Sequence, residues 1–254
     1  MSRPGAPGQS PPAWAELAWP DVADAVARHP VALLPIGAVE EHGPHLPLGT
    51  DWYAADDLAQ RLAVRAGLIR LPALPYGQVW SLEHFNGSLS IRDETLVAIV
   101  CELAAGLARA GVRGLVLLSA HLGNAAAMKR AARALAEEGS IAALPLTYPG
   151  LAEVERLVAE SSRSHPTIMH ADEMETSILL ALRPEAVDMS RAAAEYPDYP
   201  ADFEVAPIRW DTLSSSGVFG DPTRASAEKG EQIVAHVTAV ATKLIYSWRE
   251  RMQL

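Results

Sequence analysis

The sequence predicts an α/β protein: a three-layer α/β/α architecture with a mainly parallel central sheet. Short apolar runs, typical of buried strands, alternate along the chain with longer segments of helical periodicity. Strands that alternate with helices form parallel βαβ units, whose helices cover both faces of the sheet. The chain of 254 residues, 49% of them hydrophobic, is long enough to bury the core of one such domain.

The expected elements follow from these patterns in chain order. Strands are expected at the short apolar runs of residues 31–37, 68–74, 112–119 and 141–146. Helices are expected at residues 50–66, 93–110, 124–138, 173–182 and 225–248. Thr50 is expected to cap the first of these helices.

Two segments lie outside this alternation. Residues 1–12 are rich in proline, glycine and serine, so they are expected to form a disordered tail before one domain at residues 13–254. Residues 184–222 contain several proline and aromatic residues, so an irregular excursion is expected there.

The composition disfavours several classes of protein. Acidic residues number 31 and basic residues 21, a net charge of −10 that makes nucleic acid an improbable partner. There is no apolar run of the roughly 18 residues that a membrane helix needs. The first residues lack the apolar stretch of a secretory signal, and the single cysteine, Cys101, cannot form an intramolecular disulfide. These features predict a soluble, cytoplasmic protein.

Histidines and carboxylates gather where predicted strands end, which is where open parallel sheets bind ligands. These clusters span residues 40–51, 119–124 and 170–177. Imidazole and carboxylate together are ligands for divalent zinc, manganese or iron. Each residue alone is more often structural, and an Asp after Thr at a helix start is usually a cap. Three clusters at strand ends favour a metal site.

Other kinds of active site have weaker support. The chain has no G-x-S-x-G motif for a serine nucleophile and no glycine-rich phosphate loop after a strand. Cys101 lies in the middle of a predicted helix among apolar residues, so packing is its expected role.

The motif Pro35-Ile-Gly-Ala-Val-Glu40-Glu-His42-Gly-Pro-His45-Leu-Pro-Leu-Gly-Thr-Asp51 resembles the signature of the creatininase (creatinine amidohydrolase) family. The resemblance continues in His121-x-Gly123-Asn124, in residues 170–177 and in residues 217–222, and covers residues 14–250. It implies a three-layer α/β fold, a hydrolytic site with two divalent ions per chain and a homo-oligomer, commonly a hexamer.

The resemblance also implies roles for single residues. Glu40, Asp51 and His121 would hold one ion, and His42 and Asp51 the other, with Asp51 bridging the two. Creatininase itself has a Glu where this chain has Gly123, so Glu173 is the expected remaining ligand. His170 matches a catalytic histidine that could protonate the leaving group. Glu175 is placed with His170 as a candidate catalytic residue. It either supports the residues that hold the ions or is a helix N-terminal carboxylate stabilised by the helix dipole.

The chain also departs from the family pattern around the predicted pocket. It has Ser119-Ala-His-Leu122 in place of the usual Asn-Gly-His-Gly, and its loop after residue 77 is shortened. Creatinine is therefore disfavoured as the substrate. We expect this loop to shape the mouth of the pocket through four residues, although the aromatic ones could merely pack the loop: Trp80, His84, Phe85 and Asn86.

The expected function is hydrolysis of a C–N bond, other than a peptide bond, in a small polar metabolite by metal-activated hydroxide. Cyclic amides, formamides and a small modified peptide all remain open as substrates. One alternative is hydrolytic cleavage of a cyclic keto-polyol, and a less favoured one is a metal-binding scaffold without catalysis. The residues do not choose between zinc, manganese and iron.

Overall fold

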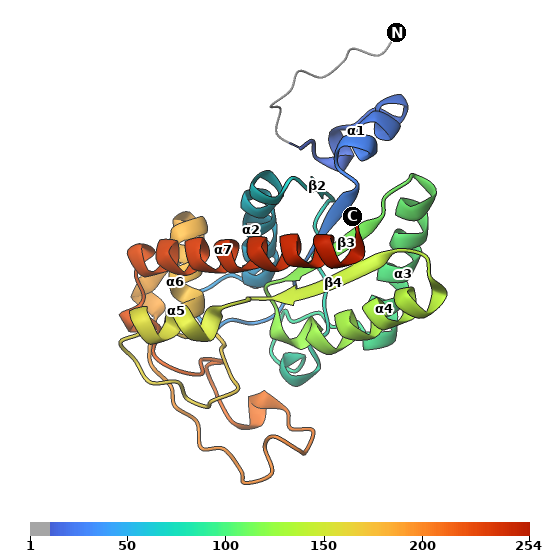
Figure 1. Ribbon diagram of the computed structural model, residues 1–254. Helices are drawn as coiled ribbons and strands as arrows, with labels where there is room; N and C mark the ends of the chain where they lie inside the picture. The colour runs from blue at the N-terminus through green and yellow to red at the C-terminus, as the bar shows by residue number, and fades with distance from the viewer. Residues whose placement is uncertain (1–10) are drawn as a thin grey trace.

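The structure is a computed structural model that describes residues 11–254, and it confirms the predicted α/β fold (Figure 1). Its parallel sheet has the strand order β2-β1-β3-β4. The strands are β1 (Val31–Ile36), β2 (Ile69–Arg70), β3 (Gly114–Ser119) and β4 (Ala142–Thr147). Val31 of β1 is in register with Gly114 of β3, which in turn is in register with Ala142 of β4.

Helices cover both faces of this sheet. They are α1 (Val22–Arg28), α2 (Thr50–Ala66), α3 (Asp93–Arg109), α4 (Ala125–Glu138), α5 (Leu151–Val158), α6 (Glu173–Leu182) and α7 (Ala227–Met252). One hydrophobic cluster joins α2, α5, α6 and α7 to the sheet, and a second cluster joins α1, α3 and α4 to it. Figure 1 shows α7 lying across the sheet.

The sequence of β1 explains this three-layer arrangement. Side chains alternate between the two faces of a strand, and β1 is apolar at every position. Val31 and Leu33 therefore pack in the cluster with α2 and α7, whereas Ala32 and Leu34 pack in the cluster with α3 and α4. A strand that is buried on both faces is typical of the centre of a parallel sheet.

The predicted strand at residues 68–74 is shorter than expected. Only Ile69–Arg70 forms a regular strand, because beyond it three residue steps, from Leu71 to Leu74, face two on β1, from Leu33 to Pro35, and this extra residue breaks the ladder. The chain nevertheless stays beside β1, since the N–H groups of Leu71 and Leu74 donate to the carbonyls of Leu33 and Pro35, each at 2.9 Å.

Other differences from the predicted elements are local. The two short helices α1 and α5 were not predicted, and α7 ends at Met252 rather than at residue 248. Thr50 is not the cap of α2: Gly49 occupies that position, and the Thr50 hydroxyl donates to the Pro47 carbonyl at 2.7 Å. Residues 184–222 form the expected irregular excursion, and the helical turns within it are short 3-10 helices.

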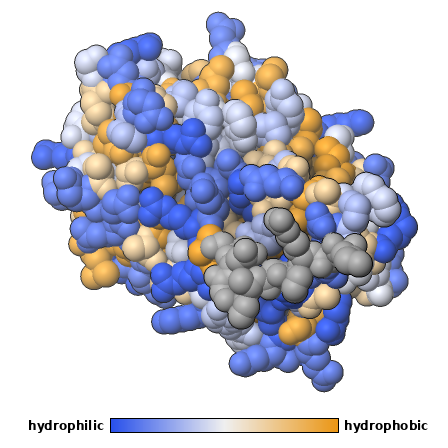
Figure 2. Space-filling model, turned by 90° about the horizontal axis from the view of Figure 1, so that it is seen from above, coloured by the Kyte–Doolittle hydropathy of each residue, from blue (hydrophilic) through white to orange (hydrophobic). Residues whose placement is uncertain are grey.

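The predicted tail at residues 1–12 lies, except for residues 11 and 12, outside the described residues. One domain at residues 13–254 stays a prediction. No helix within residues 11–254 is both long and apolar enough to cross a membrane. The face seen in Figure 2 mixes hydrophilic and hydrophobic residues.

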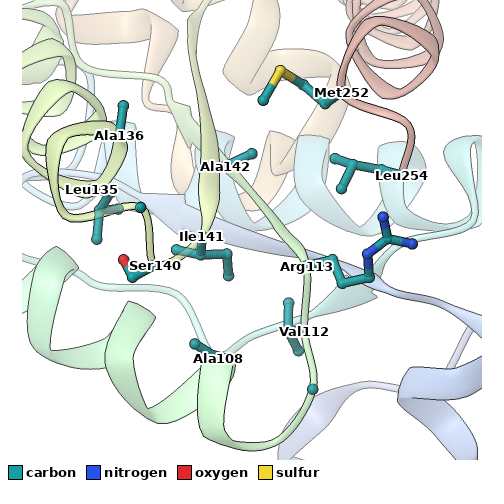
Figure 3. Close-up of a pocket in the computed structure, with 12 residues that line it drawn as sticks. Ala108, Val112, Arg113, Leu135, Ala136, Ser140, Ile141, Ala142, Met252 and Leu254 are labelled. Carbon is teal, nitrogen blue, oxygen red and sulfur yellow. The ribbon is translucent and has the colours of Figure 1, made fainter.

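A cavity of about 550 Å³ opens at the amino-terminal end of β3 and β4 (Figure 3). Its lining is mostly apolar, with Val112, Leu135, Ile141 and Leu254 among the lining residues. Its one charged lining residue, Arg113, donates to the Gln253 carbonyl at 2.6 Å. It therefore lies at the opposite end of the strands from the histidine and carboxylate clusters, and no carboxylate or imidazole side chain lines it.

Candidate active site

The structure brings the histidine and carboxylate clusters together at the carboxyl ends of β1 and β3. Glu40 and His42 lie on the loop after β1, and His121 lies just after β3. Asp51 lies in the first turn of α2, and Glu175 in the first turn of α6. All five side chains are buried. Elements that are far apart in the sequence thus build one polar centre inside an apolar fold.

Glu40, Asp51 and His121 form one group of potential metal ligands. Nδ1 of His121 lies 3.0 Å from Oε1 of Glu40 and 3.1 Å from Oδ2 of Asp51. The potential ligand atoms all lie within 4.8 Å of one another, so a single ion could contact all three.

His42, Asp51 and Glu175 form a second group. Nε2 of His42 lies 3.4 Å from Oδ1 of Asp51 and 3.7 Å from Oε2 of Glu175. Asp51 thus turns one carboxylate oxygen toward each group, as a bridging ligand must. A third group of this kind contains Glu40, His42 and His170.

The ring nitrogens that face away from the cluster have hydrogen-bond partners. Nε2 of His121 lies 2.6 Å from the Gln78 carbonyl, and Nδ1 of His42 lies 3.2 Å from the Glu40 carbonyl. A carbonyl can only accept, so each of these nitrogens carries the proton. With a metal ion bound, the opposite nitrogen would present its lone pair to the ion, which is the usual arrangement in metal-binding histidines.

Several buried ligand atoms of the cluster lack hydrogen-bond partners, and a divalent cation would satisfy them. Within residues 11–254, three buried ligand atoms have no hydrogen-bond partner: Glu40 Oε2, His42 Nε2 and Asp51 Oδ2. Buried polar atoms normally find partners, because an unpaired one costs about 1–3 kcal/mol. The concentration of carboxylates also calls for positive charge, and carboxylate with imidazole suits zinc, manganese or iron.

The pKa values show how the metal-free cluster obtains that charge. Burial opposes protonation of His42, but Asp51, together with Glu175 and Glu40, raises its pKa from 6.5 to about 10. Burial likewise opposes protonation of His121, yet Glu40 and Asp51 hold its pKa well above the usual value. Burial raises the pKa of Glu175 to about 7. Without an ion, protons on these histidines offset the carboxylates.

A pH dependence follows for the metal-free protein. Because the folded pKa of His42 exceeds the unfolded one, its stabilising contribution is complete below pH 6.5 and is lost as the pH rises through about 10. In the presence of a chelator, we expect the urea concentration at the unfolding midpoint to fall as the pH rises from 6.5 to about 10. In His42→Gln this fall should be shallower. A bound cation replaces the protons, so metal-loaded protein should show a smaller fall. An equal slope in His42→Gln would contradict this origin.

His170 lies at the edge of the cluster, held by Glu41. Its Nε2 is 3.0 Å from Oε1 of Glu41, and its Nδ1 is 3.8 Å from Oε1 of Glu40. The next residue, Ala171, has a φ of 50°, a strained value for a residue with a side chain. In this conformation its N–H donates to Oε2 of Glu175 at 2.7 Å. The strain is therefore stored where the chain passes between His170 and Glu175.

Two glycines permit this close packing. A Cβ on Gly123 would lie 2.3 Å from Nε2 of His121, so no side chain fits there. A Cβ on Gly217 would lie 1.7 Å from Oε2 of Glu41, which itself accepts a hydrogen bond from the Gly43 N–H at 2.9 Å. The segment around Gly217 therefore closes directly over the partner of His170.

The predicted role of Glu173 as a metal ligand is corrected by the structure. Its carboxylate turns away from the cluster and accepts hydrogen bonds from Lys229 Nζ and from the N–H of Ser161, the latter at 2.7 Å. Glu175, two residues further along α6, faces His42 instead. Residues two apart on a helix point about 200° apart, so only one of the two carboxylates can face the cluster.

The four predicted substrate-binding residues lie along the loop after β2. Trp80 stacks against Arg209, whose guanidinium carbon is 3.8 Å from the ring centroid. His84 is exposed and pairs with Asp211 at 3.2 Å, and Asn86 is exposed. Phe85 packs against a small hydrophobic cluster that includes Phe219. No hydrogen bond or ion pair within residues 11–254 joins these four to the cluster, and their role stays a prediction.

Three residues near the site had no role in the sequence prediction. Glu41 stood inside the first motif, but only the structure pairs it with His170. Gln78 contributes its backbone carbonyl, which any residue type could supply. Trp210, from the irregular excursion, has its ring centroid 5.8 Å from that of His170 in an edge-to-face arrangement. Proline and aromatic content alone did not place this segment beside the site.

Comparisons with known proteins find relatives that cover most of this chain. A chain from Pseudomonas putida named creatinine amidohydrolase is 30% identical, with 86% of this chain and 90% of that protein covered. The mycofactocin precursor peptide peptidase of Mycobacterium tuberculosis is 31% identical, with 86% of each chain covered. A solved structure described as "Creatininase Mn" superposes with a TM-score of 0.82 at 30% identity, covering 96% of this chain and 99% of the other.

The family model for creatininase, described as creatinine amidohydrolase, matches residues 15–245. This range includes every residue of the cluster and all of the α-helices except the last turns of α7. The chain is a hydrolase that belongs to the creatininase family.

Proposed function

We propose that this chain is a dinuclear metal-dependent amidohydrolase that cleaves a C–N bond in a small polar molecule. The observation that carries the proposal is the position of Asp51, whose two carboxylate oxygens face different groups of ligands. Glu40, Asp51 and His121 would hold one ion, and His42, Asp51 and Glu175 the other. Two ions that share a carboxylate lower the pKa of water toward about 7 and polarise a carbonyl oxygen.

His170 is the proposed proton donor to the leaving nitrogen. An amide anion is too basic to depart, so the nitrogen must be protonated as the bond breaks. Burial and the charge of His42 lower the pKa of His170, but Glu41 and Glu40 outweigh them and leave it raised. Glu41 holds the proton on Nε2, while Nδ1 faces the cluster and can deliver the other proton.

The substrate class rests on the family and on the predicted pocket mouth. The chain is about as similar to the mycobacterial peptidase as to the creatinine amidohydrolase, which makes a short peptide the second candidate substrate. Trp80, His84, Phe85 and Asn86 remain the proposed residues of the mouth. Among them, Trp80 has the clearest position, since it lines a cavity of about 520 Å³ together with Trp210.

The first test is metal content combined with a panel of substrates. Protein that has been loaded separately with zinc, manganese or iron should carry close to two ions per chain. We expect it to open the ring of creatinine or hydantoin, or to release amine from an N-formyl amino acid or a short peptide, and to stop when chelated. In His170→Asn, turnover should fall at least 100-fold with both ions retained. Full activity after removal of the ions would contradict the proposal.

Two further expectations accompany this proposal. By family resemblance the protein is a homo-oligomer, a hexamer, and its expected location is the cytoplasm. Light scattering on the purified chain measures the first, and fractionation of cells that produce it measures the second.

A further inference from the structure

Tyr148 has a backbone conformation that its residue type does not favour. It follows β4 directly and has a φ of 40°, in the left-handed region. Glycine is the usual residue there, and a bulky side chain with positive φ is a rare outlier. Pro149 adds to the strain, because a residue before proline is restricted to extended conformations. Strain of this kind persists where the surrounding structure requires the side chain, and it concentrates at functional sites.

The side chain of Tyr148 is directed into the protein beside the metal cluster. Its ring is 5% exposed and packs in the hydrophobic cluster that contains Met169 and Met174. Met169 immediately precedes His170, and Met174 immediately precedes Glu175. The carboxyl end of β4 lies beside that of β3, from which His121 extends. Tyr148 therefore occupies, on β4, the position that the cluster residues occupy on β1 and β3.

The side chain of Tyr148 is largely buried, but its hydroxyl is not among the fully buried polar atoms without a partner within residues 11–254, and the residue lines a cavity. Burial holds its pKa well above the usual value, and the nearby charges of Glu175 and Asp51 raise it further. The phenol is accordingly neutral at physiological pH and retains a proton that it can donate. A donor that lines a cavity is available to a ligand bound there.

A cavity beside Tyr148 provides room for such a ligand. It has a volume of about 460 Å³ and is lined by Leu122, Tyr148, Thr167 and Met169 among others. Leu122 follows His121 in the chain and Met169 precedes His170, so sequence neighbours of two cluster histidines line this cavity. Ligand pockets of small molecules have volumes of about 300–1,000 Å³.

We propose that Tyr148 is a catalytic residue whose phenol donates a hydrogen bond to the substrate oxygen that gains negative charge when the C–N bond is attacked. This inference rests on the proposed amidohydrolase function and adds a residue to it. A preorganised donor aimed at developing charge stabilises the transition state more than the bound substrate. The strained backbone is the means by which the fold directs the phenol toward the cluster instead of toward solvent.

The decisive variant is Tyr148→Phe, which keeps the ring and its packing and removes only the hydroxyl. On the best substrate of the panel, we expect kcat to fall about 100-fold while KM changes less than about 3-fold. The ion content and the melting temperature should match those of the wild type. The control is Tyr199→Phe, which removes a phenol that is hydrogen-bonded to Ser164 at 2.7 Å, and we expect it to leave kcat within about 3-fold.

A binding measurement makes the test independent of the substrate. Acetohydroxamate carries a charged oxygen, and its affinity for zinc-loaded protein can be measured by calorimetry. We expect Tyr148→Phe to bind it at least 10-fold more weakly than the wild type and Tyr199→Phe to bind it equally well.

The possible failures are distinguishable. Unchanged kcat in Tyr148→Phe, or unchanged acetohydroxamate affinity, would overturn the role of Tyr148 and leave the amidohydrolase proposal intact. A wild-type protein that holds no ions and hydrolyses no member of the panel would overturn the amidohydrolase proposal, and the role of Tyr148 with it.

Discussion

Replacing Asp51 with alanine is expected to remove both metal ions and to reduce hydrolysis to background. The Asp51 carboxylate lies 3.4 Å from His42 and 3.1 Å from His121, so its loss takes one ligand from each proposed ion. It would also leave the two histidines with less negative charge nearby. Metal analysis after dialysis measures the ions, and the substrate panel measures the loss of turnover.

The matched control for this variant is His42→Ala. His42 belongs to the group with Asp51 and Glu175 but not to the group with His121. Its loss should therefore weaken one ion and leave the other, giving close to one ion per chain. If Asp51→Ala instead held two ions as tightly as the wild type, Asp51 would serve only the start of α2 and the two-ion proposal would be wrong.

The second large effect is expected at Glu175. Its carboxylate is buried, lies 3.7 Å from Nε2 of His42 and is oriented by the Ala171 N–H. Glu175→Gln keeps the size of the side chain and removes its charge, so the second ion should be bound at least 10-fold more weakly. Titration of the metal-free variant with manganese or zinc measures this affinity.

Glu173→Gln is the matched control, because the residue lies two positions away on the same helix. Its carboxylate accepts hydrogen bonds from Ser161 and Lys229, and the substitution removes its charge and turns one acceptor oxygen into a donor that faces other donors. We expect a normal ion content and a loss of about 1–3 kcal/mol in the free energy of unfolding. A loss of ions in Glu173→Gln with full occupancy in Glu175→Gln would restore Glu173 as the ligand.

The strongest features of the fold could be predicted from the sequence because they depend on local patterns. Helix α2 and helix α6 have the predicted bounds, since apolar periodicity and the flanking residues act over a few positions. The edge strand was predicted too long because the extra residue between Leu71 and Leu74 leaves no mark in the apolar pattern. The short helices α1 and α5 have too few residues for a clear periodic signal.

Most of the candidate site could also be predicted, for a topological reason. Parallel strands end at the same edge of a sheet, so residues that follow β1 and β3 must lie near one another. Glu40, His42, Asp51 and His121 were accordingly expected together, and the structure places them within contact distance. Knowing which residues follow each strand is enough to predict that these side chains lie together.

What the sequence by itself determined was therefore the α/β fold and the kinds of residue at the carboxyl ends of its strands. Only the tertiary structure decided which carboxylate of α6 faces the cluster. Glu173 and Glu175 are both in the first turn, and the rotation of α6 is set by its packing against α7, where the Cβ that Gly230 lacks would lie 1.9 Å from the Ser177 carbonyl. That contact joins segments about fifty residues apart, and no local pattern encodes it.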